Sequence, residues 1–196
     1  MLTITKSEKG KPMSKAVMIS IRPRWCELIA NGKKTMEVRK TRPKLETPFK
    51  CYIYCTKPRF EHEDFFALVG KQGFYGGGKV IGEFVCDGIV WLARVGFTRR
   101  GGEPEYRIAN NGDWKSPIGR LLEEACLIEE GVDAYLGGNP GFGWHISDLK
   151  IYDTPVDITN FRNCNGCEYM GDCDTYCWKP MQRPPQSWYY VEEHMR

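Results

Sequence analysis

The stretch of residues 16–39 places the tightest limits on the fold. It opens with AVMISIR, a run rich in β-branched residues that predicts a buried strand. Pro23 then supplies a favoured first residue for a helix, and Gly32 stands where a left-handed residue closes one. The following TMEVR alternates polar and apolar residues, which predicts a second strand with one face in a core and a polar opposite face.

Short strands outnumber helices along the rest of the chain. Apolar runs predict strands at residues 49–56, 79–93 and 142–152, and the second of these is either continuous or bent at Gly88. Connections are short and no βαβ repeat is visible. The fold class expected is therefore α+β, with a small mixed β-barrel rather than a doubly wound sheet.

The middle of the chain carries a helix signal and a loop signal. Ser116 followed by Pro117 is a capping serine with proline at the first helical position, and an apolar stripe runs from there to Ile128. VDAYL predicts a second short helix. Residues 96–115 are rich in Gly, Arg and Asn and predict an exposed loop insertion.

Positive charge is concentrated at the N-terminal end. Residues 1–44 hold twelve Lys or Arg and three Glu, whereas the remainder holds sixteen basic and twenty-two acidic side chains. Such an asymmetry favours a polyanionic partner for the basic part. The alternative is that the first lysines only solvate a tail.

Residues 1–15 predict a disordered N-terminal extension. The segment has lysines but lacks the apolar h-region of a secretory signal. No run approaches the roughly 18 apolar residues that a membrane span needs. We therefore expect a cytoplasmic protein without a membrane partner.

The segment AVMISIRPRWCELIANGKKTMEVRKTRP resembles the start of ASCH domains, which are relatives of the PUA family. Those domains open with a strand, a helix, and a glycine-lysine turn before a strand with Glu and Arg two apart. CYIYCTKP, KVIGEFVCDGI and GWHISDLKIYD also resemble the family, in the same order. The likeness covers residues 16–160 and implies a PUA-like β-barrel with flanking helices.

The resemblance implies a basic cleft between the first helix, the turn and the closing strand, which would bind RNA or a nucleotide-like small molecule. Arginine offers a planar fork for phosphate or base edges, lysine a point charge, and aromatic rings a stacking surface. The expected ligand-binding residues are Arg22, Trp25, Lys33, Lys34, Glu37, Arg39, Trp144 and His145.

Several of these residues also have a purely structural interpretation. A tryptophan on an amphipathic helix, such as Trp25, is more often core, and Trp144 lies in a strand. A lone histidine in a strand, such as His145, is usually structural. Glu37 and Arg39 share a face of their strand, so a mutual ion pair is the alternative for them.

Whether the protein is an enzyme stays open on the sequence. The resemblance includes a branch of amidohydrolases that act on acylated cytidines, and ribonucleases. In the amidohydrolase branch the turn lysine is followed three residues later by a nucleophilic threonine, whereas this chain has Lys34 followed by Glu37. A lysine beside a glutamate could still perform acid–base work. A third possibility is a protein-interaction domain that uses residues 96–115.

Four of the nine cysteines cluster near the C-terminus with the spacing C-x2-C-x5-C-x3-C. They are Cys164, Cys167, Cys173 and Cys177. Four thiolates this close fit a tetrahedral structural zinc ion, an iron–sulfur cluster uses the same ligands, and metal-free thiols or disulfides are the third possibility. The other five cysteines lie in apolar segments and are expected as buried thiols.

The cysteines belong to a C-terminal extension, residues 161–196, which we expect to be metal-stabilised. Its last part, RPPQSWYYVEE, carries three aromatic residues that an unattached tail would not need. We therefore expect this segment to pack back across the barrel.

Overall fold

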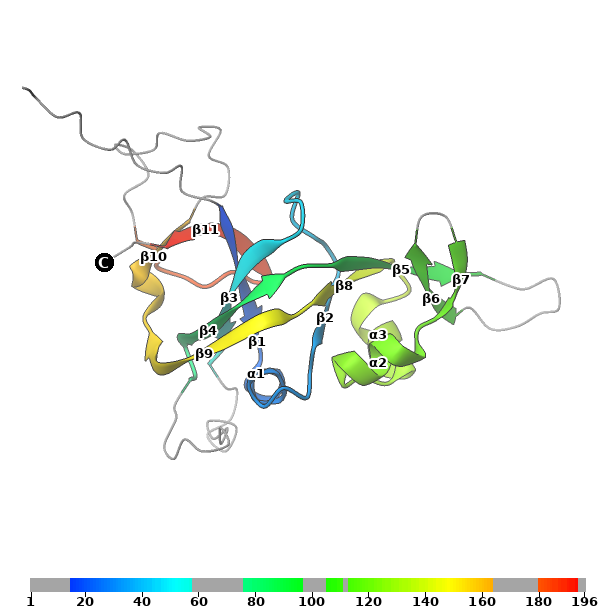
Figure 1. Ribbon diagram of the computed structural model, residues 1–196, viewed down its shortest axis with the longest axis horizontal. Coiled ribbons are helices and arrows are strands. Elements are labelled where there is room, and N and C mark those ends of the chain that lie inside the picture. Colours follow the sequence, from blue (N-terminus) through cyan, green and yellow to red (C-terminus); the bar gives the residue numbers. More distant parts are fainter. Residues whose placement is uncertain (1–14, 58–75, 97–104, 111–112, 164–179, 194–196) are drawn as a thin grey trace, which may run out of the picture.

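The computed structural model describes residues 15–57, 76–96, 105–110, 113–163 and 180–193, and within these ranges it is an α+β fold of two sheets and three α-helices (Figure 1). The elements are β1 (Ala16–Ile21), α1 (Pro23–Ala30), β2 (Met36–Arg39), β3 (Phe49–Cys55), β4 (Lys79–Cys86), β5 (Ile89–Val95), β6 (Glu105–Asn110), β7 (Asp113–Pro117), α2 (Gly119–Ala125), α3 (Glu129–Leu136), β8 (Gly141–His145), β9 (Ser147–Val156), η2 (Ile158–Asn160), β10 (Phe161–Asn163) and β11 (Trp188–Glu193).

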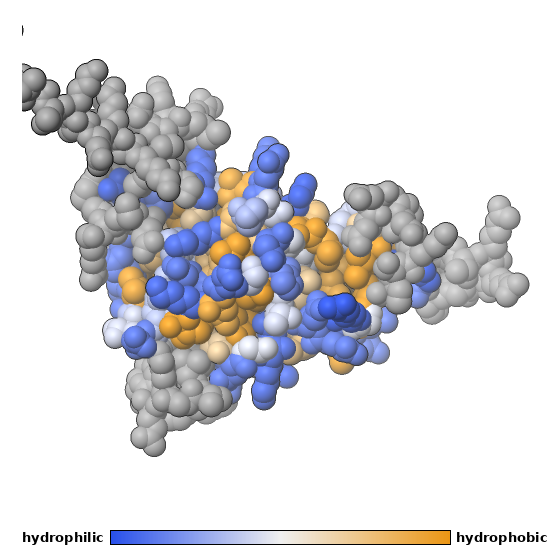
Figure 2. All heavy atoms as spheres, in the orientation of Figure 1, coloured by the Kyte–Doolittle hydropathy of each residue, from blue (hydrophilic) through white to orange (hydrophobic). Residues whose placement is uncertain are grey.

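The larger sheet has six strands in the order β10-β11-β1-β3-β4-β9. All six residues of β1 are buried, so both faces of the sheet are covered at its centre. One face carries an apolar cluster that includes Val17, Ile53 and Trp144, and α1 packs on it through Cys26 and Ile29. The other face carries a second cluster around Met18 and Phe161. Figure 2 shows apolar residues reaching the surface among charged ones around β4 and β9, the edge strand.

The smaller sheet has five strands in the order β2-β8-β5-β6-β7. Helices α2 and α3 lie together against one face of it (Figure 1). A third cluster, which includes Met36, Val38 and Leu92 from the sheet and Leu121 and Leu136 from the helices, forms the interface. The face of β2 that carries Met36 and Val38 is thus buried, as the alternation predicts.

One bent ribbon joins the two sheets, and the expected closed barrel is not found among the described strands. β4 pairs with β9 in the larger sheet, and β5 pairs with β8 in the smaller one. The chain turns from β4 into β5 at Asp87 and Gly88, and from β8 into β9 at Ile146. A barrel has one interior, whereas the apolar residues here form three clusters on several sheet faces. Two open sheets can bury all three clusters. The expectation of a small β-barrel is therefore corrected to two open sheets.

Local predictions for the first segment are confirmed, because α1 begins at Pro23 and Gly32 has a φ of +70°. Of the two alternatives for residues 79–93, the structure has two strands, β4 and β5, which are separated by Asp87 and Gly88. Two predictions for the middle of the chain are wrong. Most of residues 96–115 that the structure describes lie in β6 and β7, an antiparallel pair. Ser116 and Pro117 belong to β7, where Ser116 pairs with Ile108, so α2 begins only at Gly119.

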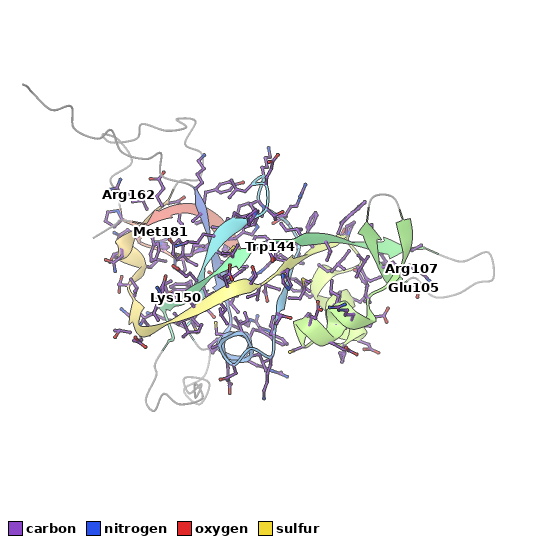
Figure 3. The ribbon with its side chains drawn as sticks, viewed as in Figure 1. Glu105, Arg107, Trp144, Lys150, Arg162 and Met181 are labelled. Atoms are coloured by element: carbon purple, nitrogen blue, oxygen red, sulfur yellow. The ribbon has the colours of Figure 1, made fainter. Side chains whose placement is uncertain are left out.

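The aromatic end of the chain forms a strand within the larger sheet. β11 pairs antiparallel with β1, and Trp188 lies opposite Ile19. β10 pairs with the other side of β11. Arg162 forms an isolated bridge with Pro180, and Met181 lies nearby in the second cluster (Figure 3).

Two sequence predictions fall outside the described residues: the disordered N-terminal extension, except for Lys15, and the four clustered cysteines. The other five cysteines are free thiols, four of them buried and Cys126 half-buried. In the part of the chain that the structure describes, no helix is both long enough and apolar enough to cross a bilayer.

Replacing Gly82 by alanine is expected to destabilise the joining ribbon. A Cβ atom there would collide with the Lys150 carbonyl oxygen and lie 3.0 Å from the Ile151 side chain on the paired strand. Because a backbone atom cannot give way cheaply, we expect a loss of roughly 1–3 kcal/mol in the free energy of unfolding, measured by urea denaturation. Gly119→Ala at the exposed start of α2 is the control and should be neutral or slightly stabilising. Equal stability of Gly82→Ala and wild type would contradict the register of β4 and β9.

Candidate functional site

The site forms on the face of the smaller sheet opposite α2 and α3. Glu37 of β2 lies opposite Trp144 of β8, and Trp144 lies opposite Ile89 of β5. Directly opposed residues in antiparallel strands project to the same side, so these three side chains form a row across the sheet. Trp144 is fully buried near the centre of the molecule, where the two sheets meet (Figure 3).

A buried ion network lies at the β2 end of this row. Glu37 accepts from two cations: one carboxylate oxygen is 3.3 Å from the Lys34 ammonium, and the other is 3.1 Å from the Arg39 guanidinium. All three residues are buried: Lys34 is 2% exposed, and Glu37 and Arg39 are each 7% exposed. The second face of the strand is therefore polar, as its alternation predicts, and it is buried as well. The Glu37–Arg39 ion pair expected as the structural alternative is present.

Backbone carbonyls satisfy the cations further. Lys34 donates to the Ala125 carbonyl at the end of α2 at 2.7 Å, and Arg39 donates to the Ser20 carbonyl of β1 at 2.6 Å. The Ser20 hydroxyl in turn donates to the Pro185 carbonyl at 2.6 Å. These bonds offset the cost of burying charge and tie β2 to three distant segments.

Two buried donors at the same face have no hydrogen-bond partner among the described residues. They are Nε of Arg39 and Nε1 of Trp144. A buried donor without a partner costs free energy, so such groups mark places where a ligand or water can bind.

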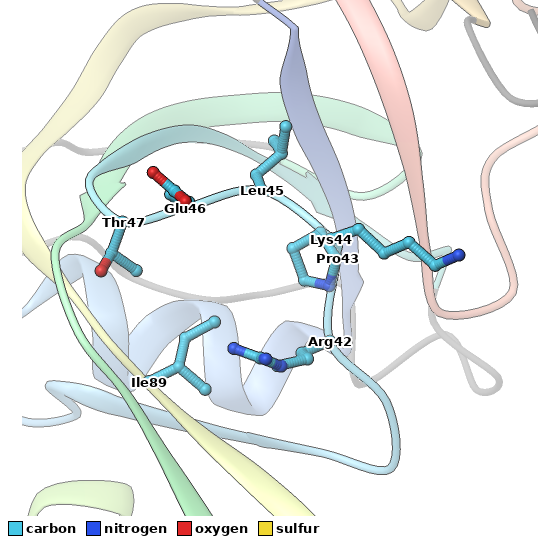
Figure 4. Close-up of a pocket in the computed structure, with 7 residues that line it drawn as sticks. All are labelled: Arg42, Pro43, Lys44, Leu45, Glu46, Thr47 and Ile89. Carbon is cyan, nitrogen blue, oxygen red and sulfur yellow. The ribbon is translucent and has the colours of Figure 1, made fainter. Parts of the chain in front are cut away.

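A hollow of about 590 Å³ opens at the Ile89 end of the row. The loop between β2 and β3 supplies the rest of its lining, which is Arg42, Pro43, Lys44, Leu45, Glu46 and Thr47 (Figure 4). The side chain of Arg42 points toward Ile89, whereas that of Lys44 points away from the others (Figure 4). Arg42 also lies over the Phe142 ring, with its guanidinium carbon 5.9 Å from the ring centroid.

The C-terminal strand holds this loop in place. Trp188 of β11 donates from Nε1 to the Thr41 hydroxyl at 3.0 Å, and the Tyr190 hydroxyl accepts from the Lys44 backbone amide at 2.7 Å. The Trp188 ring packs 6.2 Å from that of Trp144, centroid to centroid. The end of the chain thus supports the loop that lines the hollow.

The structure brings together only part of the set that the sequence predicts. Lys34, Glu37, Arg39 and Trp144 share one neighbourhood, and half-buried Trp25 joins them because the Lys34 ammonium lies 5.2 Å from its ring centroid. Trp144 is also core, in line with its structural alternative.

The remaining predicted residues lie elsewhere. Arg22 and Lys33 are exposed and take no part in the ion network. His145 pairs with Met36 in register, so it lies on the opposite face of the sheet from Glu37. There Nδ1 of His145 is 2.6 Å from the Asp87 carboxylate, and this hydrogen bond lowers the pKa of Asp87.

The sequence analysis did not single out Arg42 or the loop that lines the hollow. The signal for Arg42 was present in the run KTRPK, which continues the basic stretch beyond Arg39. The aromatic segment with Trp188 was expected to pack back on the fold, but no local signal pointed to its contact with Thr41, which spans most of the chain.

No metal site is found in the described residues, where no three His, Cys, Asp or Glu side chains gather around one point. The buried thiols have the electrostatics of core residues: burial raises the pKa of Cys86 to about 12, and burial raises the pKa of Cys51 as well. These thiols are protonated at neutral pH and are poor nucleophiles and ligands.

Glu37→Gln is expected to cost roughly 3 kcal/mol of the free energy of unfolding, because it leaves two buried cations without their counter-charge. The control is Glu105→Gln, which removes an exposed ion pair with Arg107 at the far end of the smaller sheet (Figure 3) and should cost less than about 1 kcal/mol. Chemical denaturation of both variants measures the difference. Equal losses would show that the buried network adds no more than a surface pair.

The fold resembles solved structures of one bacterial protein. No protein-family model matches the chain, and no curated protein does. The crystal structure of ASCH from Zymomonas mobilis is 19% identical, covers 90% of this chain and 87% of its own, and gives a TM-score of 0.50. Two single-residue mutants of that protein give TM-scores of 0.52 at 18% and 19% identity, covering 92% and 94% of this chain and 93% of theirs. The chain therefore has the fold of an ASCH domain, as the resemblance of its sequence implies.

Proposed function

We propose that the protein binds RNA or a nucleotide-like ligand in the hollow at the Ile89 end of the row, whose other end holds the Lys34–Glu37–Arg39 network. The observation that carries the proposal is the row on one sheet face that ends in this network at β2 and in the hollow at Ile89. The network holds two cations against one carboxylate, and Arg42 adds a further cation to the lining. An anionic ligand is the complement of that charge.

The lining suits a nucleotide in three respects. Exposed Arg42 presents a planar fork that matches a phosphate. Glu46 and Thr47 offer acceptors and a hydroxyl for the edge of a base. The fold supports the same class of ligand, because ASCH domains are relatives of the RNA-binding PUA family.

Arg42→Ala is expected to weaken the binding of single-stranded RNA by roughly fivefold, and to reduce the slope of log affinity against log salt by about one, because one phosphate contact is lost. Fluorescence anisotropy of a labelled oligonucleotide over a salt series measures both. The matched control is Arg120→Ala on α2, an arginine whose side chain is 88% exposed and which should change neither quantity.

Two outcomes would count against this function. If wild type binds neither RNA nor nucleotides at low salt, the proposal fails. If Arg42→Ala and Arg120→Ala weaken binding equally, the attraction is a general surface effect and the hollow is not the site. The third possibility, a protein-interaction domain that uses residues 96–115, would then be the next function to test.

A hydrolase that uses Lys34 and Glu37 is the second candidate, and one contact favours it. Lys34 and Glu37, the two residues that the sequence suggests for acid–base work, lie 3.3 Å apart and are buried. Turnover of an acylated cytidine or cleavage of the oligonucleotide, abolished in Lys34→Ala while Arg120→Ala stays active, would establish an enzyme in place of a binding module.

For the C-terminal extension we propose a structural zinc ion held by Cys164, Cys167, Cys173 and Cys177. The described residues on either side support this, since the Arg162–Pro180 bridge and a 2.8 Å hydrogen bond from the Met181 amide to the Phe161 carbonyl bring the two ends of the cysteine segment together. When the ends of a segment are already held together, gathering its cysteines around a metal ion costs less conformational entropy.

The purified full chain is expected to contain about one zinc ion per molecule, as measured by inductively coupled plasma mass spectrometry. Cys164→Ser combined with Cys167→Ser should remove it, whereas Cys126→Ser, which changes a cysteine outside the cluster, should not. If the protein contains iron and absorbs visible light, the cysteines hold an iron–sulfur cluster and the zinc proposal is wrong. If the protein contains no metal, the cysteines are thiols or disulfides.

A further inference from the structure

We propose that Trp91 forms a second base-stacking subsite next to the hollow, so that the ligand is single-stranded RNA that spans at least two nucleotides. This inference rests on the proposed function and extends it from one nucleotide to a strand. Three features of the described residues carry it: the position of Trp91, its exposure, and the cation beside it.

The position follows from strand geometry. Ile89 lines the hollow, and Trp91 is two residues further along β5. Residues two apart in a strand project to the same face, so Trp91 continues the surface on which the hollow opens, about 7 Å beyond Ile89. A separation of this order corresponds to one unit of an extended nucleic acid strand.

The exposure of Trp91 is unusual for its size. It is 40% exposed, although it lies in an inner strand of the sheet. Its neighbours across the ladder are Phe142 on β8 and the small Ala109 on β6. An aromatic ring presented in this way on a sheet is the usual platform for an unpaired base.

A cation lies between the two subsites. Arg42 belongs to the lining of the hollow, and its guanidinium also lies over the ring of Phe142, the cross-strand partner of Trp91. It is therefore positioned for a phosphate that joins a base in the hollow to a base on Trp91. Cations interleaved with aromatic rings favour single-stranded nucleic acid over an apolar protein segment, which would have to desolvate the charge.

A length series tests the subsite. Unlabelled uridine 5′-monophosphate and oligouridylates of two to six nucleotides compete with a labelled oligonucleotide for the full-length protein. Affinity of wild type should rise with the second nucleotide. Trp91→Leu, which keeps apolar area but loses the aromatic face, should weaken oligonucleotide binding by roughly fivefold or more while mononucleotide binding stays unchanged. Trp91→Phe retains an aromatic face and should retain most of the gain.

The outcomes separate this inference from the function on which it rests. If Trp91→Leu binds oligonucleotides like wild type while Arg42→Ala binds them more weakly, the second subsite is wrong and the hollow stands. If Trp91→Leu weakens mononucleotide and oligonucleotide equally, Trp91 does not form a separate subsite, and the inference is overturned. If wild type binds no RNA of any length, the proposed function itself fails. The midpoint temperature of thermal unfolding is measured for each variant, and a value within about 2 °C of wild type excludes a folding defect.

Discussion

The carboxylate of Glu37, buried between Lys34 and Arg39, is the interaction on which the arrangement of this molecule depends. Through its two cations it reaches the end of α2 at Ala125 and the backbone of β1 at Ser20, next to the final residue of that strand. Buried ion pairs add little net stability compared with apolar packing, because desolvation is costly, but each group tolerates few alternative partners. The network therefore acts chiefly by specifying where β2 lies between the two sheets, and the face that it specifies is the one that holds the candidate site.

The hollow lies between the loop that follows β2 and the start of β5, where the ribbon enters the smaller sheet. The ribbon of β4-β5 and β8-β9 turns from one sheet to the other, and the loop from Lys40 to Pro48 crosses the space beside the turn. Bonds from that loop to Trp188 and Tyr190 make the C-terminal strand part of its support. Loops that are held by a rigid scaffold are common places for binding residues.

The surface beside the hollow changes character along β5. Near Ile89 it is concave and bordered by the charged loop, while Trp91 presents an aromatic ring that is 40% exposed. A strand of nucleic acid has charge along its backbone and flat apolar bases. The RNA strand that we propose as ligand would meet these two kinds of surface in turn along β5.

Local backbone chemistry was readable from the sequence by itself: the β-branched run of β1, Pro23 at the start of α1, the left-handed Gly32, and the alternation that buries Met36 and Val38. These signals act over a few residues. Only the tertiary structure decided that the polar face of β2 is also buried, that the described strands form two open sheets, and that residues 105–110 and 113–117 pair as strands rather than form a loop. It also decided that the loop with Arg42 lines a hollow and is held by Trp188. The physical reason is that burial and strand pairing depend on partners far away in the chain, such as Ser20 with Pro185, and no local pattern encodes them.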